Sequence, residues 1–405
     1  MAKQYSTKEF FRQMSNHLLA RYFKEKSLFG DLDFGAMKEG KPDKLFESWL
    51  SLPDALRNQL DAEFRDIYAL CSEKGFIAIL DEARWQLREK PEEVLIIIEK
   101  LSMSPNHYER AMVTFLEHHD FWNGASRFYH ADTLSYWRKR KNLPKAPAAV
   151  DDASIEELAN LIRNYFHHKE GRGKNCIVEP FRRGDLDYFF CYPEDHSQKS
   201  IEWVDGKFDP RPHNPAFEIV YIYSQKEGTL DLNFRGSRKA IKPLQDMFAI
   251  AILKLDELPP DPQDERVYDL NPLRFENFNF VYEVGSVIQR VAVKKMRFSS
   301  RIKSGDRITV EADPTEDVGA INKLIEQANQ SIPLHLYNVT QVELAVSVKV
   351  DIDKPEKTVT IRIAYPNSCS LKYDGLDFKL RDMLEASGIE PKEPDSKTDA
   401  DTTDH

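Results

Sequence analysis

Residues 341–352 read QVELAVSVKVDI and place an apolar side chain at every second position, from Val342 through to Ile352. Strict alternation of this kind is typical of a β-strand that buries one face and leaves the other polar. The segment 353–357, DKPEK, has the composition of a turn, and the stretch 358–366, TVTIRIAYP, alternates again. The pattern therefore predicts two antiparallel strands joined by a short connection.

Helical patterns flank these two strands. Asp313, Pro314 and Glu316 signal a helix start, because proline and acidic residues are favoured in a first turn. The predicted buried stripe of that helix consists of Val318, Ile321, Leu324, Ile325 and Ala328. A last helix is predicted from Leu376 to Ser387, with Gly388 as its stop. Residues 270–390 are thus expected to form a lobe of helix, antiparallel strands and helix.

An earlier segment, residues 151–257, repeats this order of elements. Ser154 and Glu157 form a capping box at the start of a helix. The stretches 216–224, AFEIVYIYS, and 229–235, TLDLNFR, alternate around the turn QKEG, and a further helix starts at Pro243. The shared order is consistent with an internal duplication. Each sheet is expected to be covered by its helices on one face and open on the other.

The N-terminal residues 1–145 are predicted to form an all-helical domain. Segments such as 91–101, PEEVLIIIEKL, and 109–122, ERAMVTFLEHHDFW, carry apolar residues at helical spacing. The basic, proline-containing stretch 136–154 is typical of a linker. The acidic residues 391–405 are expected to be a disordered tail. The predicted fold class is therefore α+β, an N-terminal helical domain followed by two helix–sheet–helix lobes.

Composition narrows the class of protein. The chain has 405 residues, a formal net charge of -10 and 41% hydrophobic residues, with no apolar run long enough to span a membrane and no signal-peptide pattern. Four cysteines, at positions 71, 176, 191 and 369, form no CxxC pair and argue against a zinc site. We expect a cytoplasmic protein without a membrane partner.

The segment 182–190, RRGDLDYFF, places two aspartates near each other beside two arginines. Gly184-Asp185 is predicted to be a two-residue hairpin turn, with glycine at the position that needs a positive φ. That register would set Arg182 opposite Asp187. The alternative is an enzyme for phosphodiester or nucleotidyl-transfer chemistry, in which Glu179, Asp185 and Asp187 hold a divalent metal.

Cationic clusters interrupt an otherwise acidic chain. They lie at 138–141, in the glycine-containing loop 169–174, at 235–242 and along 290–307. In a regular strand Arg290 and Lys294 would lie on one face and Lys295 and Arg297 on the other, unless the strand twists or bulges. The candidate binding residues are Arg138, Lys139, Arg140, Lys141, Lys169, Arg172, Lys174, Arg235, Arg238, Lys294, Lys295 and Arg297.

These clusters suit contacts with phosphates or with acidic side chains. The sequence contains no GxSxG, HExxH, P-loop or dinucleotide-binding motif, so no cofactor is expected. The leading hypothesis is a non-enzymatic binding protein whose partner is nucleic acid or an acidic protein. Such a chain would suit an accessory role in a larger system, for example in antiviral defence.

Overall fold

The computed structural model describes residues 5–204, 206–260, 266–350 and 355–390. The described chain forms two compact units. One comprises the residues up to Leu134 together with Phe181–Leu186, and the other comprises the remainder from Ser135 onward. The fold is α+β, as predicted. Ile352 and the acidic tail 391–405 lie outside the described residues.

The first unit is helical, as the sequence predicts, and its core is rich in aromatic rings. Phe64 of α4 packs against Phe11, Phe23 and Trp49, with ring centroids 5.4 to 6.1 Å apart. Edge-to-face and tilted arrangements of this kind suit the quadrupoles of the rings. The helices are α1 Thr7–Arg12, α2 Asn16–Glu25, α3 Asp43–Leu50, α4 Asp54–Ala69, α5 Glu73–Gln86, α6 Pro91–Ser102, α7 His107–Glu117 and α8 Trp122–Thr133, with short 3-10 helices at Phe34–Ala36 and His119–Phe121.

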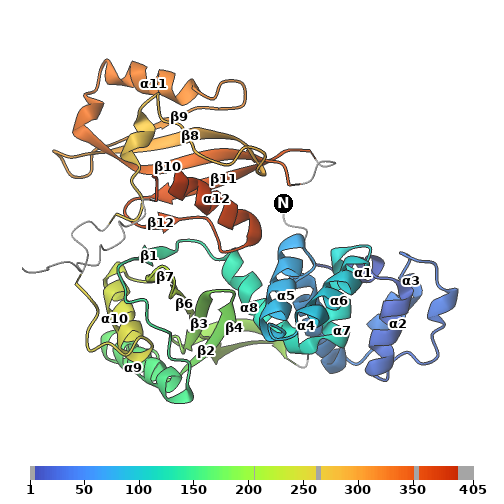
Figure 1. The fold of residues 1–405 in the computed structure, drawn as a ribbon. Coiled ribbons are helices and arrows are strands. Elements are labelled where there is room, and N and C mark those ends of the chain that lie inside the picture. The colour runs from blue at the N-terminus through green and yellow to red at the C-terminus, as the bar shows by residue number, and fades with distance from the viewer. Residues whose placement is uncertain (1–4, 205, 261–265, 351–354, 391–405) are drawn as a thin grey trace, which may run out of the picture. The chain divides into compact units, whose positions relative to one another are not determined.

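The second unit holds two lobes, each built on a five-stranded sheet. The first sheet has the order β1-β7-β6-β3-β2. Its strands are β1 Arg138–Arg140, β2 Cys176–Arg183, β3 Leu186–Pro193, β6 Ile219–Ser224 and β7 Thr229–Phe234. Helices α9 Asp152–Glu170 and α10 Ile241–Ala251 lie side by side against one face (Figure 1). A separate ribbon consists of β4 Gln198–Val204 and β5 Lys207–His213.

Strand β1 corrects the prediction of a linker over 136–154. Residues 138–140 pair antiparallel with β7, and Lys139 lies opposite Asp231. Basic residues are not typical of a buried strand, so the local pattern gave no strand signal. The pairing arises because the edge of β7 offers unpaired backbone groups that the passing chain satisfies.

The second sheet has the order β12-β11-β10-β8-β9. Its strands are β8 Ile288–Ser300, β9 Arg307–Glu311, β10 Tyr337–Val348, β11 Lys357–Ala364 and β12 Ser368–Cys369. The alternation from Val342 to Val348 is confirmed, since all four apolar side chains are buried, while Val350 lies beyond the strand and is exposed. Helix α11, Ala320–Asn329, lies next to β9, and α12, Gly375–Ala386, lies toward the other edge (Figure 1).

Two predictions for the second lobe need correction. Helix α11 begins at Ala320 rather than near Asp313, because the carboxylates of Asp313 and Asp317 accept backbone hydrogen bonds from Thr315 and Gly319. Such turns compete with a helix. The order of elements also differs between the lobes, because β8 and β9 precede α11, whereas α9 precedes β2 to β7.

The two sheets differ in how their faces are covered. The second sheet has one apolar face in its core and one polar face, as expected. The first sheet is buried on both faces: Val220, Ile222, Asp231 and Asn233 are all buried on the side away from α9 and α10. The prediction of an open face is therefore wrong for this sheet. Contacts from the second lobe explain part of the burial.

A buried ionic cluster joins the two lobes. The Tyr373 hydroxyl donates to Asp231, and Lys139 Nζ lies 2.8 Å from Glu390 Oε1. The Arg381 guanidinium stacks over Tyr373 at 4.4 Å from the ring centroid. Burial alone would raise the pKa of Glu390, but the charges of Lys139 and Arg381 outweigh it and hold that pKa below its usual value. Glu390 is thus compensated inside the protein, whereas at Asp231 burial outweighs the nearby cations and raises the pKa.

Replacing Lys139 by methionine should lower the free energy of unfolding by about 3 to 5 kcal/mol, because it leaves buried carboxylates without their cation. Urea denaturation measures the change, and Lys145→Met, at an exposed position, is the control. Because the pKa of Glu390 is lowered on folding, its stabilisation is complete above the unfolded pKa. It is lost as pH falls through the folded value. Lys139→Met should weaken this acid dependence. Equal stabilities of the two variants would contradict the prediction.

Candidate functional site

The carboxylates of the predicted metal site do not lie on one side of the sheet. Phe189 and Cys191 of β3 point into the core beneath α9 and α10, and Asp187 shares their face by alternation. Val178 of β2 points into the same core, so the side chain of Glu179 lies on the opposite face of the sheet. Asp185 lies in the exposed turn. In the described parts of the chain, no group of three histidine, cysteine or acidic side chains is placed to hold a metal ion.

The hairpin turn itself is confirmed. Strands β2 and β3 leave only Gly184 and Asp185 between them, and Gly184 has φ of 58°. Arg183 fixes the tip of the hairpin. Its buried guanidinium donates to both carboxylate oxygens of Asp132 at 3.0 Å and to Asp81 at 2.9 Å. The pairing of Arg182 with Asp187 stays a prediction.

The cationic stretch 138–141 is divided between the interior and the surface. Lys139 and Arg140 are buried, and the Arg140 guanidinium donates to the backbone carbonyl of Pro259. Arg138 and Lys141 are half-buried. The burial differs along this stretch because side chains alternate along β1 and because β1 lies between β7 and the second lobe. The charge of Lys141 acts on Glu390, so Arg138 is the residue of this stretch that we consider further as a binding residue.

The loop after α9 is divided in the same way. Gly171, with φ of 70°, ends the helix, and Lys169 and Lys174 are exposed. Arg172 instead forms ion pairs with Glu170 at 2.7 Å and Asp195 at 2.8 Å. Its guanidinium also lies 3.9 Å from the ring centroid of Phe217. The charge of Arg172 is therefore already used in holding the loop.

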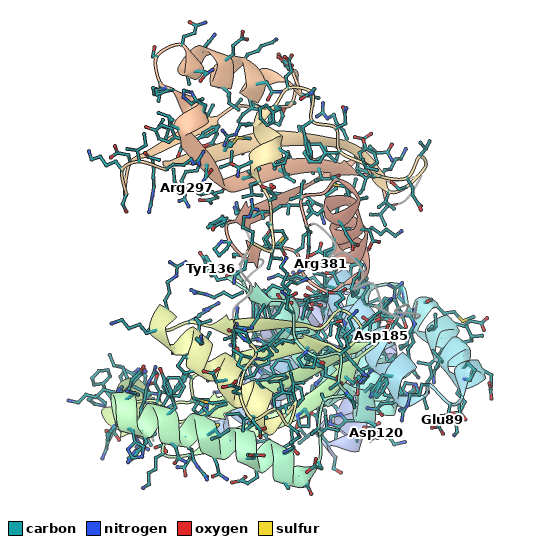
Figure 2. All side chains as sticks on the ribbon, turned by 60° about the vertical axis from the view of Figure 1, so that its left-hand side comes forward. Glu89, Asp120, Tyr136, Asp185, Arg297 and Arg381 are labelled. Carbon is teal, nitrogen blue, oxygen red and sulfur yellow. The ribbon has the colours of Figure 1, made fainter. Side chains whose placement is uncertain are left out.

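Folding brings two cationic stretches together at the end of β7. Arg235 and Arg238 are exposed just beyond the strand, and Arg138 lies on the neighbouring strand β1. The charge of Arg238 acts on Arg138, whose pKa is lowered by burial and by this like charge. Across the described residues, none of these three arginines has an acidic partner. With Tyr136, which is 76% exposed and is labelled in Figure 2, they form what we term the β7-end cluster.

Strand β8 bulges, which is the condition under which its charges share a face. Glu343 of β10 pairs with Lys295 of β8, and the next residue of β10, Leu344, pairs with Val293. Lys294 is therefore an extra residue in β8. As a result Arg290, Lys295 and Arg297 all lie on the polar face of the second sheet. Lys295 is paired with Glu311 at 2.9 Å. Arg297 lies on the strand layer of this lobe (Figure 2).

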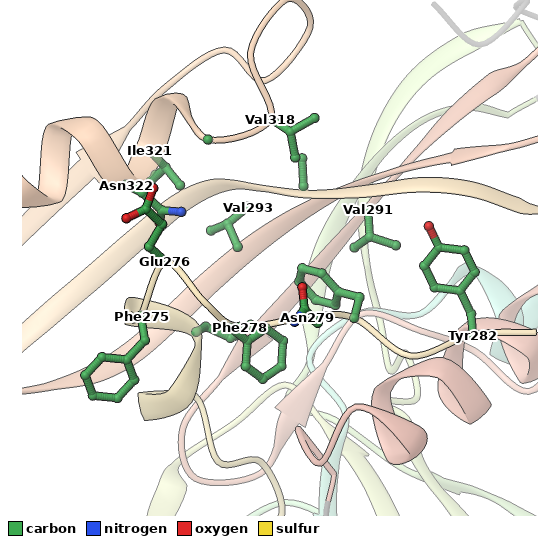
Figure 3. Close-up of a pocket in the computed structure, with 14 residues that line it drawn as sticks. Phe275, Glu276, Phe278, Asn279, Tyr282, Val291, Val293, Val318, Ile321 and Asn322 are labelled. Atoms are coloured by element: carbon green, nitrogen blue, oxygen red, sulfur yellow. The ribbon is translucent and has the colours of Figure 1, made fainter.

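A cavity in the second lobe was not predicted. It has a volume of about 460 Å³ and lies between β8, the start of α11 and the segment 275–282. Figure 3 shows Val291 and Val293 on one side and Phe278 on the other, with Glu276 beside Asn322. The alternation of Phe278, Phe280 and Tyr282 was the signal in the sequence that this segment packs on the sheet. The lining mixes apolar, amide and carboxylate groups and singles out no ligand.

Comparisons with known proteins give no assignment. No family model matches the sequence, and no curated protein is similar to it. No helix in the described residues is long and apolar enough to cross a membrane.

Replacing Arg183 by methionine should reduce the free energy of unfolding by about 3 to 5 kcal/mol, because Asp132 would lose its buried cation. Pulse proteolysis across a urea series measures this change. Arg88→Met is the control, since Arg88 is exposed and stacks over Trp85 at 4.4 Å from the ring centroid. A loss for Arg88→Met as large as that for Arg183→Met would show that the ion pairs do not hold the hairpin tip.

Proposed function

We propose that this chain is a non-enzymatic binding protein that contacts single-stranded nucleic acid through the β7-end cluster. The observation that carries the proposal is that the pairing of β1 with β7 brings Arg138 within electrostatic reach of Arg238, at the sheet edge that also carries Arg235 and an exposed tyrosine. Cations contact phosphates, and an exposed aromatic ring offers a stacking platform for a base. The combination favours a single strand, because the bases of a duplex are already stacked.

The backbone of Tyr136 supports this proposal. Its φ is 69°, in the left-handed region that a bulky residue rarely adopts. This conformation costs about 1 to 2 kcal/mol relative to right-handed backbone. The Ser135 carbonyl accepts a hydrogen bond of 2.6 Å from Asn233 Nδ2, which holds the chain beside the end of β7. Strain that holds a large ring in solvent is typical of a functional position.

The electrostatics of the cluster point the same way. Arg138 and Arg238 repel each other, and the described residues supply no carboxylate to separate them. A bound phosphate would relieve this repulsion and accept hydrogen bonds from the guanidinium groups. Of the other candidate residues, Lys169 and Lys174 remain available at the surface. The buried or paired Lys139, Arg140 and Arg172 are assigned structural roles.

The double variant Arg235→Glu/Arg238→Glu should weaken binding of a short oligo-dT strand roughly tenfold or more at low salt and flatten its salt dependence, because phosphate contacts are lost. Fluorescence anisotropy measures both quantities. Lys145→Glu/Lys226→Glu is the control, since it reverses two exposed charges, and Lys226 lies in the turn at the opposite end of β7.

Equal losses of oligonucleotide affinity in the two double variants would show that net charge alone explains the effect. Absence of oligonucleotide binding by the wild-type chain at low salt would reject the proposed function. Binding of polyglutamate in place of the oligonucleotide would identify an acidic protein partner instead.

Tyr136→Asn separates recognition from stability. Asparagine tolerates left-handed backbone, so the free energy of unfolding should stay the same or rise by up to about 1 kcal/mol. Affinity for the oligonucleotide should fall by about 1 to 3 kcal/mol, the usual contribution of a stacked base. Tyr136→Phe, which keeps the ring, should bind like the wild type. Undiminished affinity in Tyr136→Asn would remove the stacking role.

A further inference from the structure

The polar face of the second sheet carries a ladder of alternating charges. Arg362 of β11, Glu343 of β10, Lys295 of β8 and Glu311 of β9 lie in register across four strands. Arg362 lies 3.3 Å from Glu343, and Lys295 lies 2.9 Å from Glu311. Both acids of this row are therefore already engaged by neighbouring cations. They are not available to the next row of the sheet.

The next row of paired residues on this face contains an arginine but no acidic residue. Arg297 lies between Thr309 of β9 and Gln341 of β10, and Arg307 is a diagonal neighbour on the same face, opposite Ser299. Arg297 is half-buried, and its Nε atom is shielded from solvent without a hydrogen-bond partner. Burial first, and then the charge of Arg307, lower the pKa of Arg297. No ion pair involves either arginine within the described ranges.

Some of the hydroxyl and amide groups around this row already form side-chain hydrogen bonds, and others do not. The hydroxyls of Ser299 and Thr340 bond to each other at 2.8 Å, and Thr340 also donates to the Arg297 carbonyl. Thr309 and Gln341 make no side-chain hydrogen bond to any other described residue. The row thus presents two guanidinium groups, a hydroxyl and an amide that can all donate.

Strand irregularities lie on both sides of this row. The extra residue Lys294 lies on one side in β8, and between Val339 and Gln341 the register shifts again, which makes Thr340 the extra residue of β10. Bulges bend a strand and redirect its side chains, and they are common next to binding sites. Between these two irregularities the pairing is regular, so ordinary alternation places Arg297 and Arg307 on the same face as the charge ladder.

We propose that Arg297, Arg307, Thr309 and Gln341 form a binding site for a phosphate-type oxyanion on the polar face of the second sheet. A tetrahedral oxyanion accepts from both guanidinium groups and places a negative charge between two like charges. This site is separate from the β7-end cluster and does not depend on nucleic-acid binding there.

The test is thermal unfolding of the full chain in inorganic phosphate against sodium chloride at equal ionic strength. The wild-type midpoint should rise with phosphate beyond the general effect of an excluded salt, and this excess should disappear in Arg297→Gln and in Arg307→Gln. Arg362→Gln, on the same face but within the ladder, should keep it. Without phosphate, Arg297→Gln should unfold at a higher temperature than the wild type, because a repulsive charge is gone.

The site is rejected if phosphate gives the same shift in all four proteins, or if Arg362→Gln loses the excess as well. Arg235→Glu/Arg238→Glu should retain the phosphate response, which separates failure here from failure of the proposed function. Oligonucleotide binding by Arg297→Gln identifies the source of the anion: reduced affinity assigns a backbone phosphate, and unchanged affinity assigns a free phosphate compound.

Discussion

The pairing of β1 with β7 is the constraint on which the second unit depends. Three consecutive basic residues become an edge strand, and alternation sends each in a direction that the ladder fixes. Lys139 enters the ionic cluster with Glu390, and Arg138 remains at the surface beside Arg238. The pairing of β1 with β7 therefore places Lys139 where it contacts the second lobe and Arg138 where it contributes to the cationic edge.

Cations of the same type have different roles because their surroundings differ. Arg183 and Arg172 have carboxylates within hydrogen-bond distance, so their charges fix a hairpin tip and a loop. Arg235 and Arg238 have none among the described residues, and their charge is available to a partner. Removing a compensated buried ion is costly to the fold, whereas changing an exposed one mainly affects recognition. Burial and pairing thus separate structural from binding residues more sharply than residue type does.

Both sheets use polar residues, but in opposite ways. The first sheet buries Asp231 and Asn233 and satisfies Asp231 with a tyrosine from the other lobe. The second sheet leaves its polar face open and pairs Lys295 and Arg362 there with Glu311 and Glu343 in a cross-strand charge ladder. The unpaired arginines beside that ladder are distinctive because their neighbours are balanced. A sheet with one solvated face can carry such a site without disturbing its apolar core.

The sequence by itself determined the elements whose signal is local. Alternation from Val342 to Val348, the glycine of the 184–185 turn and the helical spacing of the N-terminal segments each follow from contacts within one strand, turn or helix. These local signals together predicted the α+β class. The sequence also supplied the list of cationic clusters, and it set the condition that a twist or a bulge was needed to align the charges of β8.

Tertiary structure alone decided which cations meet and which are buried. Residues 138–140 became a strand because β7, far along the chain, presented an unpaired edge. Glu179 and Asp187 lie on opposite faces because Val178 and Phe189 both pack into the core beneath α9 and α10, and alternation then fixes the face of each acid. The position of the bulge at Lys294 was fixed by pairing with β10. These outcomes depend on partners distant in sequence, whose geometry no local pattern of side chains encodes.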